Sequence, residues 1–211
     1  MAVPLDAIRA IHNAFRKDIV AMDVTANNAA HSHGNLDPVR ERYRFFNEVL
    51  VWHALGEEEF VFPVMDKVAP LVSEPYEQDH RGLDTLFERL TRVVASDDTV
   101  EVARTTAAFK FHLDIHLNKE EKHLYRIFDE RVPQADQMVI GGKMAQKIPQ
   151  DRFPELITWL YLLIDLNDRE NMTRIWQQAM PAPAFANAAK LIRTTIGDEW
   201  AELVGRIPEL T

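Results

Sequence analysis

Apolar residues recur along most of this chain at spacings of three and four, the period of a helix that buries one face. The first such stripe predicts a helix from about Asp6 to Asn27, and three more stripes follow before Pro133. Pro63 lies near the end of the second stripe, where we expect it to kink or end the helix. No stretch alternates with the period of two that a half-buried strand requires, so the pattern predicts an all-α protein.

The four stripes are joined by short connections, which predicts antiparallel neighbours and hence an up-down four-helix bundle within residues 1–135. Beyond this point the pattern changes, because Gly141 and Gly142 interrupt it and mark a loop. Three further helices are predicted at about Arg152 to Asp165, Asp168 to Met180 and Pro183 to Val204. We expect residues 136–211 to form a C-terminal helical extension packed on the bundle.

The candidate functional residues are polar residues at core-facing positions of the stripes. They are His12, His53, Glu57, His80, His116 and Glu120. A buried carboxylate is costly unless it is paired, coordinated or protonated, and the same stripes contain no Lys or Arg to pair with it. In each histidine–glutamate pair the two residues are four apart, so they share one helix face. Because a carboxylate can bridge, this set suits two metal ions. Imidazole and carboxylate donors without a thiolate suit iron, manganese or zinc.

The two histidine–glutamate pairs belong to a weak internal repeat, in which residues 51–62 (VWHALGEEEFVF) parallel residues 114–125 (DIHLNKEEKHLY). His112 lies one turn before His116 and is a possible extra ligand or a partner of a ligand. A tyrosine phenolate could also complete a metal shell, and spacing selects none of the candidates Tyr43, Tyr76, Tyr125 and Tyr161. A metal-free bundle with hydrogen-bonded His–Glu pairs remains an alternative.

The order of these residues resembles the hemerythrin-like (HHE cation-binding) family over about residues 5–131: a lone His, HxxxEE, a second lone His and a second HxxxEE on successive helices. The resemblance implies a non-haem, oxo- or hydroxo-bridged di-iron centre with the four histidines as terminal ligands and Glu57 and Glu120 as bridges. Oxygen carriers of the family have a further histidine on the third helix, where Leu83 or Asp84 stands here, and HxxxxD on the fourth. The chain is therefore more similar to bacterial members, and the segment from Asp168 to Ala186 resembles the C-terminal extensions of actinobacterial ones.

The resemblance implies a centre that reacts with small oxidants or diatomics, namely peroxide, nitric oxide or O2. The expected role is peroxide or nitric oxide detoxification, by a peroxidase- or catalase-like or an NO-consuming reaction. The alternative is a non-enzymatic protein that binds O2 or NO or senses iron or oxygen. No catalytic residue beyond the metal ligands is predicted, and no motif for a nucleotide or a large organic substrate occurs.

The composition limits the classes of partner and ligand that the protein is expected to bind. The net charge of -9 argues against a general nucleic-acid binder, which needs clustered Lys and Arg. The absence of cysteine excludes disulfides, thiolate metal sites and cysteine nucleophiles. Neither a signal peptide nor a run of about 18 apolar residues is present, so we expect a cytoplasmic protein with no membrane contact. The sequence predicts small-molecule ligands and indicates no particular protein partner.

Overall fold

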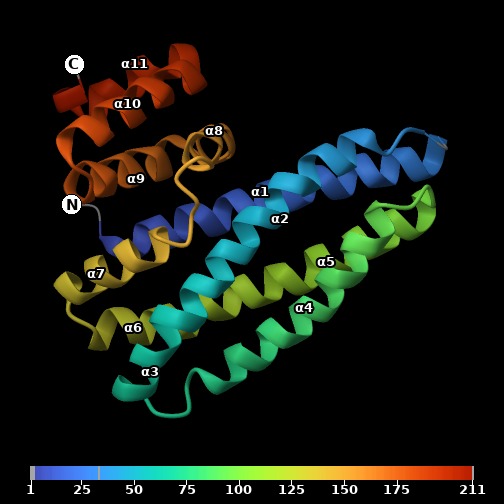
Figure 1. Cartoon of the computed structure of the whole chain (residues 1–211), viewed down its shortest axis with the longest axis horizontal. Coiled ribbons are helices and arrows are strands. Elements are labelled where there is room, and N and C mark those ends of the chain that lie inside the picture. Colours follow the sequence, from blue (N-terminus) through green and yellow to red (C-terminus); the bar gives the residue numbers. More distant parts are fainter. Residues whose placement is uncertain (1–2, 33, 211) are drawn as a thin grey trace. The chain divides into compact units, whose positions relative to one another are not determined.

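The computed structural model describes residues 3–32 and 34–210, and helices account for most of this part of the chain (Figure 1). No strand occurs among these residues, which confirms the all-α prediction. The chain divides into two compact units: one from Phe15 to Arg131, the other made of residues up to Ala14 together with those from Val132 onward. The first turns of the chain thus group with the C-terminal unit, whereas the sequence pattern predicted a single bundle over all of residues 1–135.

The unit from Phe15 to Arg131 contains the rest of α1 and the elements up to α6. These elements are α1 (Pro4–Ser32), α2 (Asp37–Gly56), η1 (Glu57–Val61), α3 (Phe62–Val68), α4 (Glu74–Val94), α5 (Thr99–Lys119), η2 (Glu120–Leu124) and α6 (Tyr125–Arg131). The helix α1 is longer at both ends than the pattern predicted. The short segments η1 and η2 have π-helical hydrogen bonding.

The four long helices of this unit form the predicted bundle. Polar contacts connect each helix to the next: Asp18–Arg42 joins α1 to α2, Tyr43–Thr91 joins α2 to α4, Asp79–Lys119 joins α4 to α5, and Asp23–Lys110 joins α5 to α1. Inside the ring, phenylalanines of the four helices pack against one another: Phe15–Phe46 joins α1 to α2, Phe46–Phe109 joins α2 to α5, and Phe87–Phe109 joins α4 to α5, with ring centroids 5.6, 6.3 and 5.7 Å apart. These apolar contacts form part of the core of the bundle.

Both helices that carry a histidine–glutamate pair change to π hydrogen bonding at the glutamate. The backbone N–H of Phe62 donates to the carbonyl of Glu57, and the N–H of Tyr125 donates to the carbonyl of Glu120. Pro63 is the second residue of α3, which follows the first π segment, so the helix continues past the proline and does not end there. The second π segment forms without a proline, so the π turn is a property of both motifs, and one that hydrophobic periodicity does not reveal.

The second unit consists of α7 (Gln134–Ala145), α8 (Phe153–Leu163), α9 (Leu166–Ala179), α10 (Ala182–Ile196), η3 (Gly197–Glu199), α11 (Trp200–Arg206) and η4 (Pro208–Leu210), with the start of α1. The prediction of a loop at Gly141 and Gly142 was wrong, because both lie within α7. Each helical glycine costs about 1 kcal/mol relative to alanine. Buried Ile140 and Gln137, whose side-chain amide donates to the Val132 carbonyl at 2.8 Å, help to offset this cost.

The core of the second unit includes residues from the start of α1. Ala10 and Ala14 are buried in one cluster with Tyr161, Ile192 and Leu203. These alanines leave room for the larger side chains of the C-terminal helices. No helix in the described part of the chain is long and apolar enough to cross a membrane.

Candidate metal centre

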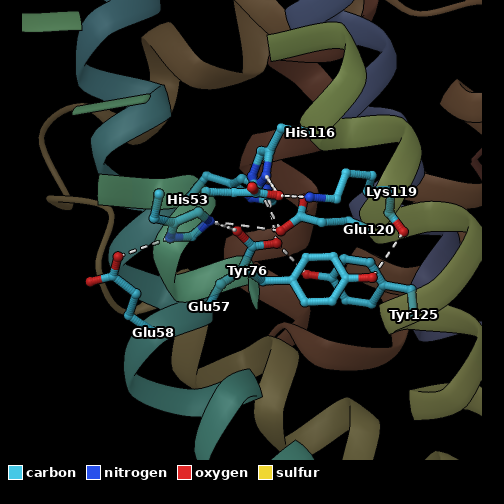
Figure 2. Close-up of polar contacts among 10 residues, drawn as sticks. His53, Glu57, Glu58, Tyr76, His116, Lys119, Glu120 and Tyr125 are labelled. Carbon is cyan, nitrogen blue, oxygen red and sulfur yellow. Dashed lines mark hydrogen bonds and ion pairs between the residues drawn. The ribbon is translucent and has the colours of Figure 1, made fainter. Parts of the chain in front are cut away.

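The histidine–glutamate pairs and the third-helix histidine meet inside the bundle unit (Figure 2). Glu57 and Glu120 are the first residues of η1 and η2, His80 is on α4, and His116 is in the last turn of α5. All four side chains are buried, and each offers a ligand atom within 4.8 Å of the others. His53, in the last turn of α2, contacts the same cluster.

The histidines direct the same ring nitrogen at the carboxylates. The Nε2 atom of His53 lies 3.3 Å from Oε1 of Glu57, and that of His116 lies 3.3 Å from Oε1 of Glu120. The Nε2 atom of His80 lies between the two carboxylates, 3.6 Å from Oε2 of Glu57 and 3.7 Å from Oε1 of Glu120. Three imidazole nitrogens therefore converge on two buried carboxylates, which is a donor set for a cation.

His12 completes the set predicted from the sequence. It is fully buried on α1, three residues before the bundle unit begins at Phe15. Within the bundle unit, Nε2 of His80 faces both glutamates, and each glutamate also lies 3.3 Å from the histidine four residues before it. Each carboxylate has two oxygens, so each is able to serve two ions.

The other candidates from the sequence lie in different surroundings. His112 is exposed, packs its ring against Phe111 at 5.6 Å and is not part of the buried cluster. Tyr125 is buried, and its hydroxyl donates to Oε1 of Glu57. The internal repeat is the sequence signal that could have singled out Tyr125 among the four tyrosines. Tyr125 lies five residues after Glu120, just as Phe62 lies five residues after Glu57.

Burial and mutual repulsion dominate the electrostatics of the cluster. Burial and the charge of Glu57 raise the pKa of Glu120 to about 7. Burial lowers the pKa of His80, but its interaction with Glu120 and the charge of Glu57 outweigh this and raise the pKa to about 9. Burial and the charge of Glu57 also raise the pKa of Tyr125, so its hydroxyl stays protonated and donates. Two carboxylates in a dry site thus attract protons, and a metal cation meets the same demand.

Carboxylates also approach the outward nitrogens of two histidines. Oε1 of Glu58 lies 2.8 Å from Nδ1 of His80. Oδ2 of Asp79 lies 3.9 Å from Nδ1 of His116, beyond hydrogen-bond length, and the same oxygen is paired with Lys119 (Figure 2). Metal-binding histidines commonly donate their other N–H to such a carboxylate, which fixes the ring.

Comparison with protein families agrees with this geometry. Residues 3–98 and again residues 71–144 match the hemerythrin HHE cation-binding domain. The chain belongs to this family. It is accordingly a metal-binding protein, and its imidazole and carboxylate donors fit iron. The first match contains His12, His53, Glu57 and His80, and the second contains His80, His116 and Glu120, so together they include the whole predicted set.

Similar curated proteins come from a plant. The zinc finger protein BRUTUS of Arabidopsis thaliana is 27% identical over 177 residues, which is 81% of this chain and 14% of that protein. Two BRUTUS-like zinc finger proteins of the same species are each 22% identical, over 71% and 86% of this chain and 13% and 16% of their own lengths. The chain thus spans about a seventh of these relatives, and it has no cysteine with which to build a thiolate zinc finger. No solved structure matches the chain significantly.

Proposed function

We propose that this hemerythrin-family protein holds two iron ions and reacts with small oxidants or diatomics, with peroxide and nitric oxide as the principal substrates. The observation that carries the proposal lies within the bundle unit: Nε2 of His80 faces both Glu57 and Glu120, and each of these carboxylates also has the imidazole of its own helix at 3.3 Å. Carboxylates that each face more than one imidazole are the arrangement expected of bridges between two ions. His12 and His53 would hold one ion, and His80 and His116 the other.

Bound iron would supply the redox chemistry, because it cycles between ferrous and ferric states. The chain's own residues set which molecules reach the site. Phe15 packs edge-on against His53 at 5.5 Å, and Phe62 packs against His80 at 5.1 Å. This apolar surround excludes water and large substrates, and it favours small molecules such as H2O2, NO and O2. Peroxide disproportionation, in which two H2O2 give two water and one O2, requires no further reactant.

A second candidate function is ligand binding without turnover, either as an O2 or NO binder or as a sensor of iron or oxygen. The observation that favours it is the length of the relatives, in which the matched region is about a seventh of the protein. In those proteins the region is one part of a larger chain. The same bundle could therefore report on iron or a small ligand instead of consuming it.

Metal content and turnover together test the proposal. We expect the purified, iron-loaded chain to contain about two iron ions and to absorb in the near ultraviolet. It should release O2 from peroxide and consume NO in the presence of peroxide. The zinc-loaded chain is the matched control, because zinc has no redox chemistry and should be inert. Reversible O2 binding without turnover would favour the second candidate. Less than one equivalent of iron with no near-ultraviolet band would favour the metal-free bundle and overturn both.

A further inference from the structure

We propose that Glu58 is a positioning residue for the metal centre: its carboxylate accepts the Nδ1 proton of His80 and so holds the ring with Nε2 directed at Glu57 and Glu120. This inference rests on the proposed function, because it assigns a role to a residue that would act on iron only through His80. The contact itself is a 2.8 Å hydrogen bond between α4 and the π segment η1.

The backbone explains how two consecutive glutamates serve the same site. Glu57 and Glu58 open η1, where hydrogen bonds run from one residue to the fifth along. A π turn contains more residues than an α turn, so adjacent side chains diverge less in direction than on an α-helix. Glu57 is therefore buried against the histidines, while Glu58 reaches the outer edge of His80 with its side chain 42% exposed.

The two ends of the His80 ring match these two neighbours. Nε2 faces the buried carboxylates of Glu57 and Glu120 at 3.6 and 3.7 Å, and Nδ1 faces Glu58. With the proton on Nδ1, the Nε2 lone pair is available for a metal. A carboxylate acceptor favours this tautomer and also makes the imidazole a better donor.

The equivalent residue in the other half of the repeat makes a different contact. Glu121 is ion-paired with Arg16 at 2.7 Å. Arg16 lies four residues after His12, and the corresponding position after His80 is occupied by Asp84. No arginine therefore stands at that place to draw Glu58 away from His80.

Metal affinity of the Glu58→Gln variant tests the inference. We expect iron(II) affinity, measured by competition with a chelator, to fall about 10- to 100-fold, as for other outer partners of metal-binding histidines. Glu58→Asp, whose side chain is one methylene shorter, should lose less. The charge-matched control is Glu88→Gln, which removes a carboxylate that is 73% exposed on the same helix as His80 and should bind iron as the wild type does.

A spectroscopic readout separates positioning from general loss of structure. In the zinc-loaded wild type, nitrogen-15 correlation spectra should show His80 protonated at Nδ1 with a hydrogen-bonded proton, and this signal should shift or exchange faster in Glu58→Gln but not in Glu88→Gln. Equal affinities and an unchanged His80 signal in Glu58→Gln would overturn the role of Glu58 alone. Absence of metal binding by the wild type would overturn the proposed function as well.

Discussion

The first histidine–glutamate pair, His53 with Glu57, and the second, His116 with Glu120, have the same backbone but different neighbours. In each pair the imidazole Nε2 lies 3.3 Å from the glutamate four residues later, and the glutamate opens a π segment. π turns in helices are rare and are often found at functional sites. Their occurrence at both motifs indicates that the turn belongs to the site and is not local irregularity.

The neighbours that break this symmetry are few. The hydroxyl of Tyr125 donates to Glu57, whereas the repeat places Phe62, which has no hydroxyl, at the corresponding position after Glu57. Glu58 bonds His80, whereas Glu121 pairs with Arg16. The repeated residues are therefore the proposed ligands, and the unrepeated ones make the surroundings of the two carboxylates different.

The largest expected effect tests whether the two glutamates are equivalent bridges. We expect Glu57→Ala and Glu120→Ala each to reduce the metal content of the iron-loaded protein from about two equivalents to less than one, because each removes a carboxylate that faces more than one of the buried histidines. Glu130→Ala, at an exposed glutamate paired with Arg126, is the control and should retain both ions. Retention of both ions by Glu57→Ala would contradict the bridging role.

The next effect concerns the metal-free protein. The pKa of Glu120 is about 7 in the folded chain against an ordinary value of 4.5, so the folded state binds this proton more tightly than the unfolded state does. The stabilisation of the folded state by this bound proton is complete below pH 4.5 and is lost as the pH rises through 7. His80, with a pKa of about 9, extends the same trend to higher pH.

Chelated protein should therefore become less stable from about pH 5 to about pH 8, and about 3 kcal/mol of the loss should be attributable to Glu120. Urea unfolding at both pH values measures the change, and Glu120→Gln should have a flatter profile because it removes the titrating group. The affinity for iron should instead rise with pH over this range, because protons compete with the metal for the same atoms. A steeper fall in stability for Glu120→Gln than for the wild type would contradict the assignment.

The variant Tyr125→Phe tests the hydroxyl that donates to Glu57 and has no counterpart in the other half of the repeat. A buried hydrogen bond to a charged group contributes about 2 kcal/mol, so we expect the free energy of unfolding of the metal-free variant to fall by roughly that amount. Tyr76→Phe is the matched control, because that hydroxyl bonds only a backbone carbonyl at 3.3 Å and should contribute less. If Tyr125→Phe keeps both ions and its absorption spectrum, phenolate ligation is ruled out; loss of one ion would establish it.

Periodicity was sufficient for the bundle and for its six inward polar residues. Spacings of three and four place a residue on one helix face whatever the details of the loops, so the buried positions of His80 and Glu120 follow from the sequence alone. The helix at Gly141 and Gly142 could not be predicted in this way. Local propensity disfavours it, and burial of neighbouring residues on α7 decides the outcome.

Interactions between elements were also beyond the sequence. As one of three consecutive glutamates, Glu58 could from the sequence either lie on a solvated face or orient a ligand, and the packing of α4 against η1 decides this by bringing it to His80. His112 has a spacing consistent with ligation, yet it is exposed, because it lies one turn away from the buried His116. Periodicity identified residues of the right type, but the orientation of each side chain depends on tertiary structure.

The smallest expected effect concerns the origin of the π segments. Pro63 lacks an N–H group and follows η1, so it is the obvious cause of the first π turn. The second π turn forms with Arg126 at the corresponding position, which argues that proline is compatible with the turn and not its cause. We therefore expect Pro63→Ala to keep both ions and to change the free energy of unfolding by less than about 1 kcal/mol. Arg126→Pro, the reciprocal change, should cost less than the roughly 3 kcal/mol of a proline inside an ordinary helix. Loss of iron from Pro63→Ala alone, measured as metal content, would instead show that proline imposes the first π turn and that the two halves reach the same backbone for different reasons.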